Sequence, residues 1–153
     1  AMISSFSPFT SNARLGSQLW QGNDQLESIL AEMGGLGDMR FVVVGKGAIL
    51  EHTNSLSNLR IAETPKGRLA TFSNTPKGET NSFELHIRMN EIKGIKFVLV
   101  EKFGTQLRIA RLIGGDTGSE VLLSAIVKDP HVDEAVDKTW LRMVEKYGGE
   151  VTF

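Results

Sequence analysis

The stretch Ser82-Phe83-Glu84-Leu85-His86-Ile87-Arg88-Met89 alternates polar and apolar side chains without a break. Side chains along a β-strand point to opposite faces with a period of two residues, so this alternation predicts a strand with one apolar and one polar face. The polar face carries Glu84, His86 and Arg88. A histidine displayed in this way can be an axial metal ligand, a proton carrier or a solvated surface residue, and the strand alone leaves these three readings open.

The composition around this strand is that of an ordinary globular protein. The chain has 153 residues, of which 41% are hydrophobic and 23% charged, and this length suits a single domain. The net charge of −1 gives no field that would attract nucleic acid, and no apolar run is long enough to insert into a membrane. The absence of cysteine excludes disulfides, thiolate metal sites and cysteine nucleophiles.

Seven further segments resemble strands because they are rich in β-branched and aromatic residues and are bounded by turn residues. Two connectors, Thr64-Pro65-Lys66-Gly67 and Asn74-Thr75-Pro76-Lys77-Gly78, each place a glycine two residues after a proline, which is typical of turns. With the strand at 81–89, the predicted strands cover residues 39–44, 48–53, 58–63, 68–73, 95–103, 106–113 and 120–127. Short connections between so many strands predict a mostly antiparallel sheet.

A helix is predicted at each end of this β region. Residues 24–33 begin with a capping box and carry Leu26, Ile29, Leu30 and Met33 at helical spacing. The second helix is predicted to be capped by Asp129, to have Pro130 in its first turn, and to end at the glycines 148–149. Together these elements predict one α+β domain over residues 24–150, a large sheet of about eight strands with a short N-terminal and a C-terminal helix packed on it.

Residues 1–23 differ from the rest of the chain. They are rich in serine and contain one basic and no acidic residue, which is typical of a flexible arm and also of the remnant of an organelle transit peptide. Ala1 before Met2 resembles the scar of an expression tag. The expected location is therefore the cytoplasm, or the plastid stroma if the arm is a trimmed transit peptide.

Several common kinds of site are not supported by the sequence. The three histidines lie far apart and show none of the spacings of a zinc site, which needs three or four convergent ligands. No Gly-x-Ser-x-Gly motif marks a serine nucleophile. The glycines at 114–118 are followed by a predicted strand rather than by Lys-Ser/Thr and a helix, so this segment is expected to be a hairpin loop. One imidazole is, however, enough to ligate haem iron, because the porphyrin supplies the other four nitrogens.

Five segments of the chain resemble the small haem-utilisation carriers of the ChuX/HutX type, in the same order and with similar spacing over about residues 26–145. Leu85-His86-Ile87-Arg88 is similar to that family's Gly-His-Ile-Lys strand, and Val98 to Phe103 is similar to its Ile-Glu-Arg-Lys-Phe strand. The other matching segments are 41–51, which resembles its strand pair, 67–74, in the place of its glycine-aromatic-Asn stretch, and 125–129, which resembles its last strand. An upstream histidine of some members falls at Val44 here.

The resemblance implies a fold close to half of a HemS/ChuS-type protein, a homodimer and a haem cleft between sheet and helices. It places a haem-binding histidine at His86, as the axial ligand of the iron in haem b. Basic residues can hold the haem propionates, and the candidates are Arg88, Arg108 and Arg111.

Three functions of different classes are therefore open. The preferred one is an intracellular haem carrier or chaperone that acts in haem utilisation or homeostasis. The second is an enzyme that processes a tetrapyrrole, either by degrading haem oxidatively or by removing the metal. The third is an interaction module that has kept the fold without a ligand.

Overall fold

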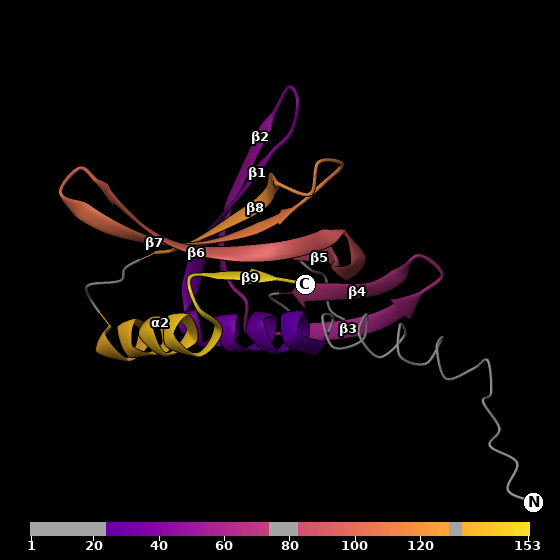
Figure 1. The fold of residues 1–153 in the computed structure, drawn as a ribbon. Helices are drawn as coiled ribbons and strands as arrows, with labels where there is room; N and C mark the ends of the chain where they lie inside the picture. The colour runs from indigo at the N-terminus through magenta and orange to yellow at the C-terminus, as the bar shows by residue number, and fades with distance from the viewer. Residues whose placement is uncertain (1–23, 74–82, 129–132) are drawn as a thin grey trace, which may run out of the picture.

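The computed structural model describes residues 24–73, 83–128 and 133–153, which form two antiparallel sheets with helices packed against them (Figure 1). The predicted α+β class, with a short N-terminal and a C-terminal helix on a large antiparallel sheet, is confirmed. The arm predicted over residues 1–23 lies outside the described part of the chain. Within the described part, no helix combines the length and apolar character needed to cross a membrane.

The larger sheet has six strands in the order β2-β1-β8-β7-β6-β9, and all neighbours are antiparallel. Its members are β1 (Asp38–Val44), β2 (Ile49–Ser55), β6 (Ile92–Lys102), β7 (Thr105–Gly114), β8 (Glu120–Val127) and β9 (Glu150–Thr152). The glycines at 114–118 form the predicted hairpin loop between β7 and β8, where Gly115 and Gly118 both have positive φ. β9 was not predicted, because three residues are too few to show a period.

The smaller sheet has the order β3-β4-β5 and consists of β3 (Leu59–Thr64), β4 (Gly67–Ser73) and β5 (Glu84–Arg88). The Thr64-Pro65-Lys66-Gly67 turn closes its first hairpin, and the Thr64 hydroxyl donates a hydrogen bond of 2.6 Å to the carbonyl of Gly67. All eight predicted strands therefore exist, but they divide between two sheets. The chain leaves the large sheet after β2, builds the small sheet, and returns through the 3-10 turn η2 (Met89–Glu91) into β6.

Two helices cover one face of the large sheet (Figure 1). Residues 24–33 form the first, and α2 (Glu134–Tyr147) follows β8; between the first helix and β1 lies the 3-10 turn η1 (Gly34–Leu36). The ring of Trp140 on α2 meets Phe97 on β6 edge to face, with 5.6 Å between centroids. The apolar residues predicted at helical spacing on the first helix are buried, as are Trp140 and Met143 on α2. They join the sheet in one core that includes Leu26, Ile29, Leu30, Met33, Met39, Phe41, Phe72, Ile95, Leu112, Trp140 and Met143.

The start of α2 differs from the prediction. Asp133 is the N-cap, and its carboxylate accepts a hydrogen bond of 2.9 Å from the backbone N–H of Ala135. The predicted cap at Asp129 is therefore wrong, and Asp129 and Pro130 themselves lie outside the described residues. The reason is local. Asp133, four positions later, can also cap the helix, and the acidic residues Glu134 and Asp137 in the turn that follows it stabilise a helix N-terminus at that point.

Glu32 joins the two helices near the C-terminal end of each. Its Oε1 accepts hydrogen bonds of 2.6 Å from the Lys146 ammonium and of 2.6 Å from the Tyr147 hydroxyl. Burial raises the pKa of Glu32, but these two hydrogen bonds and the positive charges of Lys146 and Arg142 together outweigh burial, so that the pKa is lowered overall. Burial and the hydrogen bond to Glu32 raise the pKa of Tyr147. This contact fixes the C-terminal ends of the helices to each other.

Two contacts hold the small sheet in place. Arg68 on β4 forms ion pairs with Asp24 and Glu27 of the first helix and with Glu63 on β3. Phe83, directly before β5, lies parallel to Phe41 of β1, with 5.7 Å between centroids, and to His52 of β2. One contact is electrostatic and the other aromatic, and together they attach opposite ends of the β4–β5 pair to its surroundings.

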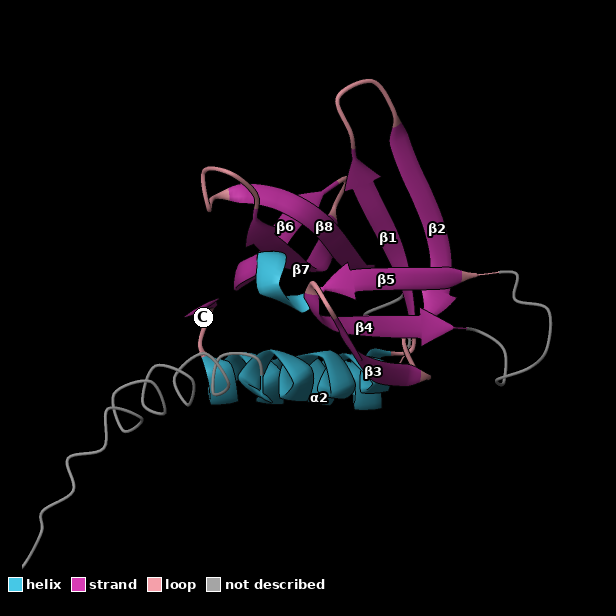
Figure 2. Cartoon of the chain, turned by 90° about the vertical axis from the view of Figure 1, so that its right-hand side faces the viewer, coloured by secondary structure: helices cyan, strands magenta, loops and turns pink. Residues whose placement is uncertain are grey.

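The β1–β2 hairpin extends away from the layered part of the molecule (Figures 1 and 2). Its tip exposes large aliphatic side chains, with 62% of Val44, 65% of Ile49 and 69% of Leu50 accessible to solvent. β2 is also the edge strand of the large sheet. Exposed aliphatic residues on an edge strand are typical of a surface that pairs with another chain.

Candidate functional site

The outer face of the small sheet carries the polar side chains of β5. The register pairs His86 with Thr71, Glu84 with Ser73 and Arg88 with Leu69 of β4. Directly opposite residues of neighbouring strands share a face, so these side chains form rows on one surface. Leu85 and Ile87 point the other way into the core, as the alternation predicts. Figure 2 shows β5 and β4 side by side across the front of the molecule.

Both ring nitrogens of His86 have neighbours. Nδ1 lies 2.9 Å from the hydroxyl oxygen of Thr71, and Nε2 lies 3.2 Å from Oε2 of Glu84. Glu84 in turn lies 3.7 Å from the guanidinium of Arg60 on β3. The His86 side chain is 49% exposed, whereas Thr71 is only 9% exposed. The imidazole thus has Nδ1 against Thr71 of β4 and Nε2 against Glu84 of its own strand.

The series Thr71–His86–Glu84 contains the groups of a hydroxyl nucleophile, a base and an orienting acid. Acyl transfer also needs backbone N–H groups that are free to bind an oxyanion. β4 lies between β3 and β5 and is hydrogen-bonded to both, so the N–H groups around Thr71 are used within the sheet. The arrangement is therefore suited to holding an imidazole in one orientation rather than to nucleophilic catalysis.

The surroundings of His86 fit one axial ligand of a haem. A half-exposed imidazole with a fixed Nδ1 is the form in which histidine binds iron. Leu69 and Ala62 share its face of the sheet and offer apolar contacts next to it. Arg88, two residues further on the same face, is a cation at the distance from His86 that two strand positions give, about 7 Å. These are the three kinds of group that a haem requires: an iron ligand, apolar contact and a partner for a carboxylate.

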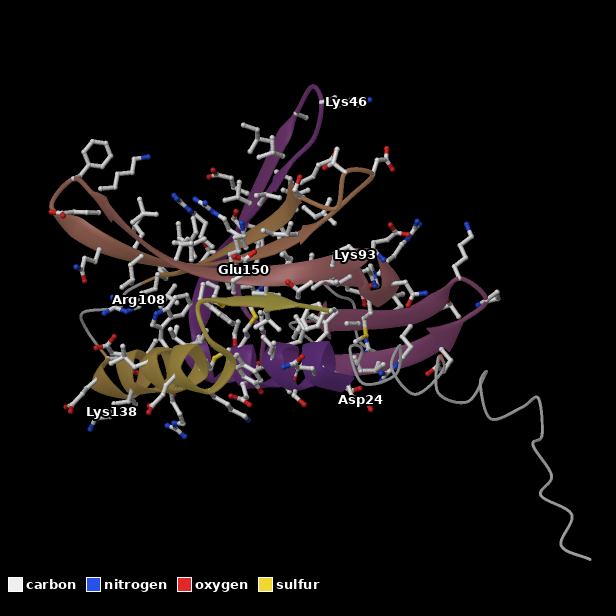
Figure 3. All side chains as sticks on the ribbon, viewed as in Figure 1. Asp24, Lys46, Lys93, Arg108, Lys138 and Glu150 are labelled. Atoms are coloured by element: carbon white, nitrogen blue, oxygen red, sulfur yellow. The ribbon has the colours of Figure 1, made fainter. Side chains whose placement is uncertain are left out.

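Arg108 and Arg111, predicted to lie near the propionates, are on the large sheet. They lie on opposite faces of β7, because three positions separate them. Arg108 is buried between the large sheet and α2 (Figure 3), where its Nη2 lies 2.7 Å from Oδ1 of Asp137. Arg111 is half-buried on the face that points away from α2, between Lys96 and Ser124. His86 and Arg88 thus share one face of the small sheet, whereas Arg108 and Arg111 belong to the large sheet.

The Arg108–Asp137 contact is short but poorly aligned. Although the distance is that of an ion pair, Nε and Nη1 of Arg108 and Oδ1 of Asp137 have no hydrogen-bond partner of suitable geometry. A hydrogen bond weakens steeply as its angle departs from linear, so charge rather than a well-formed hydrogen bond joins the two side chains. Arg108 is therefore a buried cation with donors to spare.

The other histidines have different surroundings. The ring of His52 on β2 stacks on Phe83, with 4.5 Å between centroids, and its Nε2 lies 3.5 Å from the Asn54 amide. His131 lies outside the described residues. In the part of the chain that is described, no three histidine, aspartate or glutamate side chains converge as a metal site would require.

Thr71 is the site residue that sequence reasoning missed. Only the pairing register of β4 against β5 indicates that Thr71 lies beside His86, and the alternation of polar and apolar residues within either strand does not determine that register. Arg60 was also missed, because it comes from the third strand of the same sheet.

Comparison with known proteins agrees with this fold. A family model, described as haem utilisation ChuX/HutX, matches residues 20–112. A search of the curated proteins finds no match to the chain.

Three solved structures with the same fold show how far the likeness extends. Protein AGR_C_4470 of Agrobacterium tumefaciens aligns with a TM-score of 0.62 at 15% identity, over 81% of this chain and 67% of that one. ChuX aligns with a TM-score of 0.60 at 12% identity, over 81% and 72%. Holo-PhuS, a heme-binding protein of Pseudomonas aeruginosa, aligns with a TM-score of 0.57 at 10% identity, over 78% of this chain and 30% of its own.

These similarities define an α+β protein of the haem-utilisation class. Because the family model matches more than half of the residues, the chain belongs to the ChuX/HutX haem-utilisation family.

Proposed function

We propose that this protein binds haem b through His86 and acts as an intracellular haem carrier or chaperone. The observation that carries the proposal is the half-exposed imidazole, whose Nδ1 lies against Thr71, so that Nε2, beside Glu84, is the nitrogen that would bind iron. Membership of a haem-utilisation family supports the choice of haem over another ligand. Haem would supply the iron, and the chain would supply the axial nitrogen and the surface on which the ring rests.

Arg88 is the residue that we propose for a haem propionate. It lies on the same face of β5 as His86, and guanidinium groups bind carboxylates through paired hydrogen bonds. Arg108 and Arg111 stay candidates for the second propionate. The unpaired donors of Arg108 support it chemically, although they lie against α2.

Titration of the purified protein with hemin tests the proposal. We expect a saturable shift of the Soret band that His86→Ala weakens by at least tenfold in affinity, since the iron then loses its protein ligand. The matched control is His52→Ala, which removes the other described histidine and none of the groups that contact His86; its melting temperature shows whether loss of the stack on Phe83 has disturbed the fold. An unaltered hemin spectrum with the wild-type protein, or equal binding by both variants, would contradict the assignment.

The same complex separates carriage from catalysis. A Soret band that stays constant with ascorbate and oxygen present agrees with a carrier. Loss of the band under these conditions, with a new bilin absorbance, would indicate the oxidative enzyme instead. Purified protein that binds no tetrapyrrole would leave only the interaction module.

We also propose a homodimer, with the exposed side chains of the β1–β2 hairpin in its interface. Val44, Ile49 and Leu50 are largely exposed, and β2, which carries Ile49 and Leu50, is the edge strand of the large sheet. Light scattering should give about twice the mass of one chain, and Leu50→Arg with Ile49→Arg should reduce it to one. Leu141→Arg, at an exposed position on α2, is the control. A wild-type protein that is monomeric at all concentrations would disprove the dimer.

The cytoplasm of a bacterium is the location that we propose. The structural neighbours that name an organism come from bacteria, which favours this compartment over the plastid stroma. Cell fractionation with an antibody against the protein tests it, and recovery in a membrane or periplasmic fraction would overturn it.

A further inference from the structure

Glu84 determines which nitrogen of His86 carries a proton. An ionised carboxylate can only accept hydrogen bonds, so the nitrogen that faces it must be a donor. Nε2 lies 3.2 Å from Oε2 of Glu84 and therefore carries a hydrogen, either in the neutral Nε2–H tautomer or in the charged imidazolium. The opposite tautomer would direct a lone pair at a negative oxygen.

Binding to iron makes the opposite demand. A metal takes the lone pair of a deprotonated nitrogen. Nδ1 is not accessible to a large ligand, because it lies 2.9 Å from Thr71, which is almost buried in the sheet. Nε2 is consequently the nitrogen for the iron, and it is the one that Glu84 keeps protonated.

Thr71 can support both states of the ring. A hydroxyl group is a donor and an acceptor. It can donate to Nδ1 while Nε2 is protonated, and it can accept from Nδ1–H once Nε2 is free. Arg60 lies 3.7 Å from Glu84 and offers the carboxylate an alternative partner when it moves away from the imidazole.

From this geometry we infer that Glu84 competes with the iron for His86, and that Thr71 positions the ring in the tautomer that binds. Haem binding then requires Nε2 to lose its hydrogen, which moves to Nδ1 in the neutral ring or to water from the imidazolium, and requires the Glu84 carboxylate to turn toward Arg60. The inference rests on the proposed function, and it adds a device that limits haem affinity and makes release easier. Both Glu84 and Thr71 act through His86 and are positioning residues.

The first test uses the protein without haem. Long-range ¹H–¹⁵N NMR of the imidazole distinguishes a protonated Nε2 from a free one. We expect Nε2–H in the wild type, and we expect Glu84→Ala to increase the Nδ1–H population. A wild-type ring that is neutral, with its hydrogen on Nδ1, would overturn the inference while leaving the proposed haem ligand intact.

The second test measures hemin affinity. Glu84→Ala should bind about fivefold more tightly than the wild type, which is the effect of a lost competing hydrogen bond of about 1 kcal/mol. The control is Glu63→Gln, which removes an acidic group from the same sheet at a side chain paired with Arg68 instead. Equal gains in both variants would reduce the effect to overall charge and refute the role of Glu84.

Thr71 is tested by two substitutions of different chemistry. Thr71→Val keeps the shape and the preference for a strand but removes the hydroxyl, and it should bind hemin about fivefold more weakly. Thr71→Ser restores the hydroxyl and should restore the affinity and the NMR response. Weak binding by both variants would indicate a packing role and would contradict the tautomer role. No binding by the wild type and by Glu84→Ala would disprove the haem proposal and the inference together.

Discussion

The rings of His52 and Phe83 lie nearly parallel, at an interplanar angle of 13° and with 4.5 Å between their centroids. Phe83 also lies parallel to Phe41, so one aromatic residue beside β5 connects the small sheet to both strands of the β1–β2 hairpin. The strand that carries His86 is held to the large sheet by this stack.

Removal of the Phe83 ring should therefore destabilise the protein. We expect Phe83→Ala to lower the free energy of unfolding by about 2 kcal/mol, below the range for a fully buried phenylalanine because Phe83 is partly exposed. Urea denaturation followed by fluorescence measures it. Phe103→Ala is the control, since Phe103 is 95% exposed and should change stability by less than about 0.5 kcal/mol. Equal stabilities of the two variants would show that the aromatic stack of Phe83 contributes nothing to the free energy of unfolding.

The buried ion pair should respond unequally to loss of its two members. Asp137→Ala leaves the Arg108 cation buried without a partner and should cost about 3 kcal/mol. Arg108→Met removes the buried charge itself and should cost less. The double variant Arg108→Met with Asp137→Leu should be more stable than Asp137→Ala alone.

Thermal and urea denaturation of these variants provide the measurement. Lys138→Ala breaks the exposed pair with Glu134 on the same helix and serves as the control, with an expected change of about 0.5 kcal/mol or less. If Asp137→Ala and Lys138→Ala cost the same, Arg108 reaches water more freely than its burial implies.

The contact of Glu32 with Lys146 and Tyr147 should make stability depend on pH. The pKa of Glu32 is lowered in the folded protein, so its contribution is complete above the ordinary value of 4.5 and disappears as the pH falls through the lowered pKa. Glu32→Gln should therefore destabilise the protein by about 0.5 kcal/mol at about pH 7 and by almost nothing at about pH 3.

Urea denaturation at both pH values tests this expectation, with Glu145→Gln at an exposed position of α2 as the control. A difference between wild type and Glu32→Gln that does not shrink in acid would mean that the neutral amide, and not the lost charge, causes the effect.

Gly67 should be intolerant of any side chain. Its φ of +107° disfavours L-residues, and an added Cβ would lie 1.9 Å from the Nδ2 atom of Asn90. Gly67→Ala should cost about 2 kcal/mol, part from the backbone and part from displacement of Asn90. Gly47→Ala is the matched control, because a Cβ there meets nothing within 4 Å. Stability measured by thermal denaturation should fall for Gly67→Ala alone, and equal melting temperatures would contradict the expectation.

Much of the fold was predictable because local patterns determine it. Leu26, Ile29, Leu30 and Met33 repeat at helical spacing and are all buried. β5 alternates with a period of two, and its apolar residues face the core as expected. Such patterns reflect which face of an element is buried, and that information is contained in a short window of sequence.

The arrangement of these elements was less predictable because it depends on register. A tight turn over residues 74–78 would place Ser73 opposite residue 79, whereas Ser73 pairs with Glu84. For this reason the alternation placed His86 on a polar face but could not indicate Thr71 as its neighbour. The division into two sheets was missed for a similar reason, since no short window shows that β3 pairs only with β4.

The arginines illustrate the same limit at the candidate site. Arg88 shares a strand with His86, so its place on the same face follows from the period. Arg108 and Arg111 lie in a different sheet from His86, and only the tertiary structure shows this division.

The strand order of the two sheets also has a consequence for folding. β3, β4 and β5 are neighbours along the chain and pair in sequence, whereas the large sheet closes only when β1 meets β8, through pairs such as Met39 with Val127. Local pairs lose less chain entropy on forming than distant ones. The small sheet is therefore expected to acquire its structure early and the β1–β8 seam late. In pulsed hydrogen exchange during refolding, the amides of β4 should become protected before those of β1. The reverse order would show that the small sheet, with the polar face around His86, forms only after the large sheet has closed.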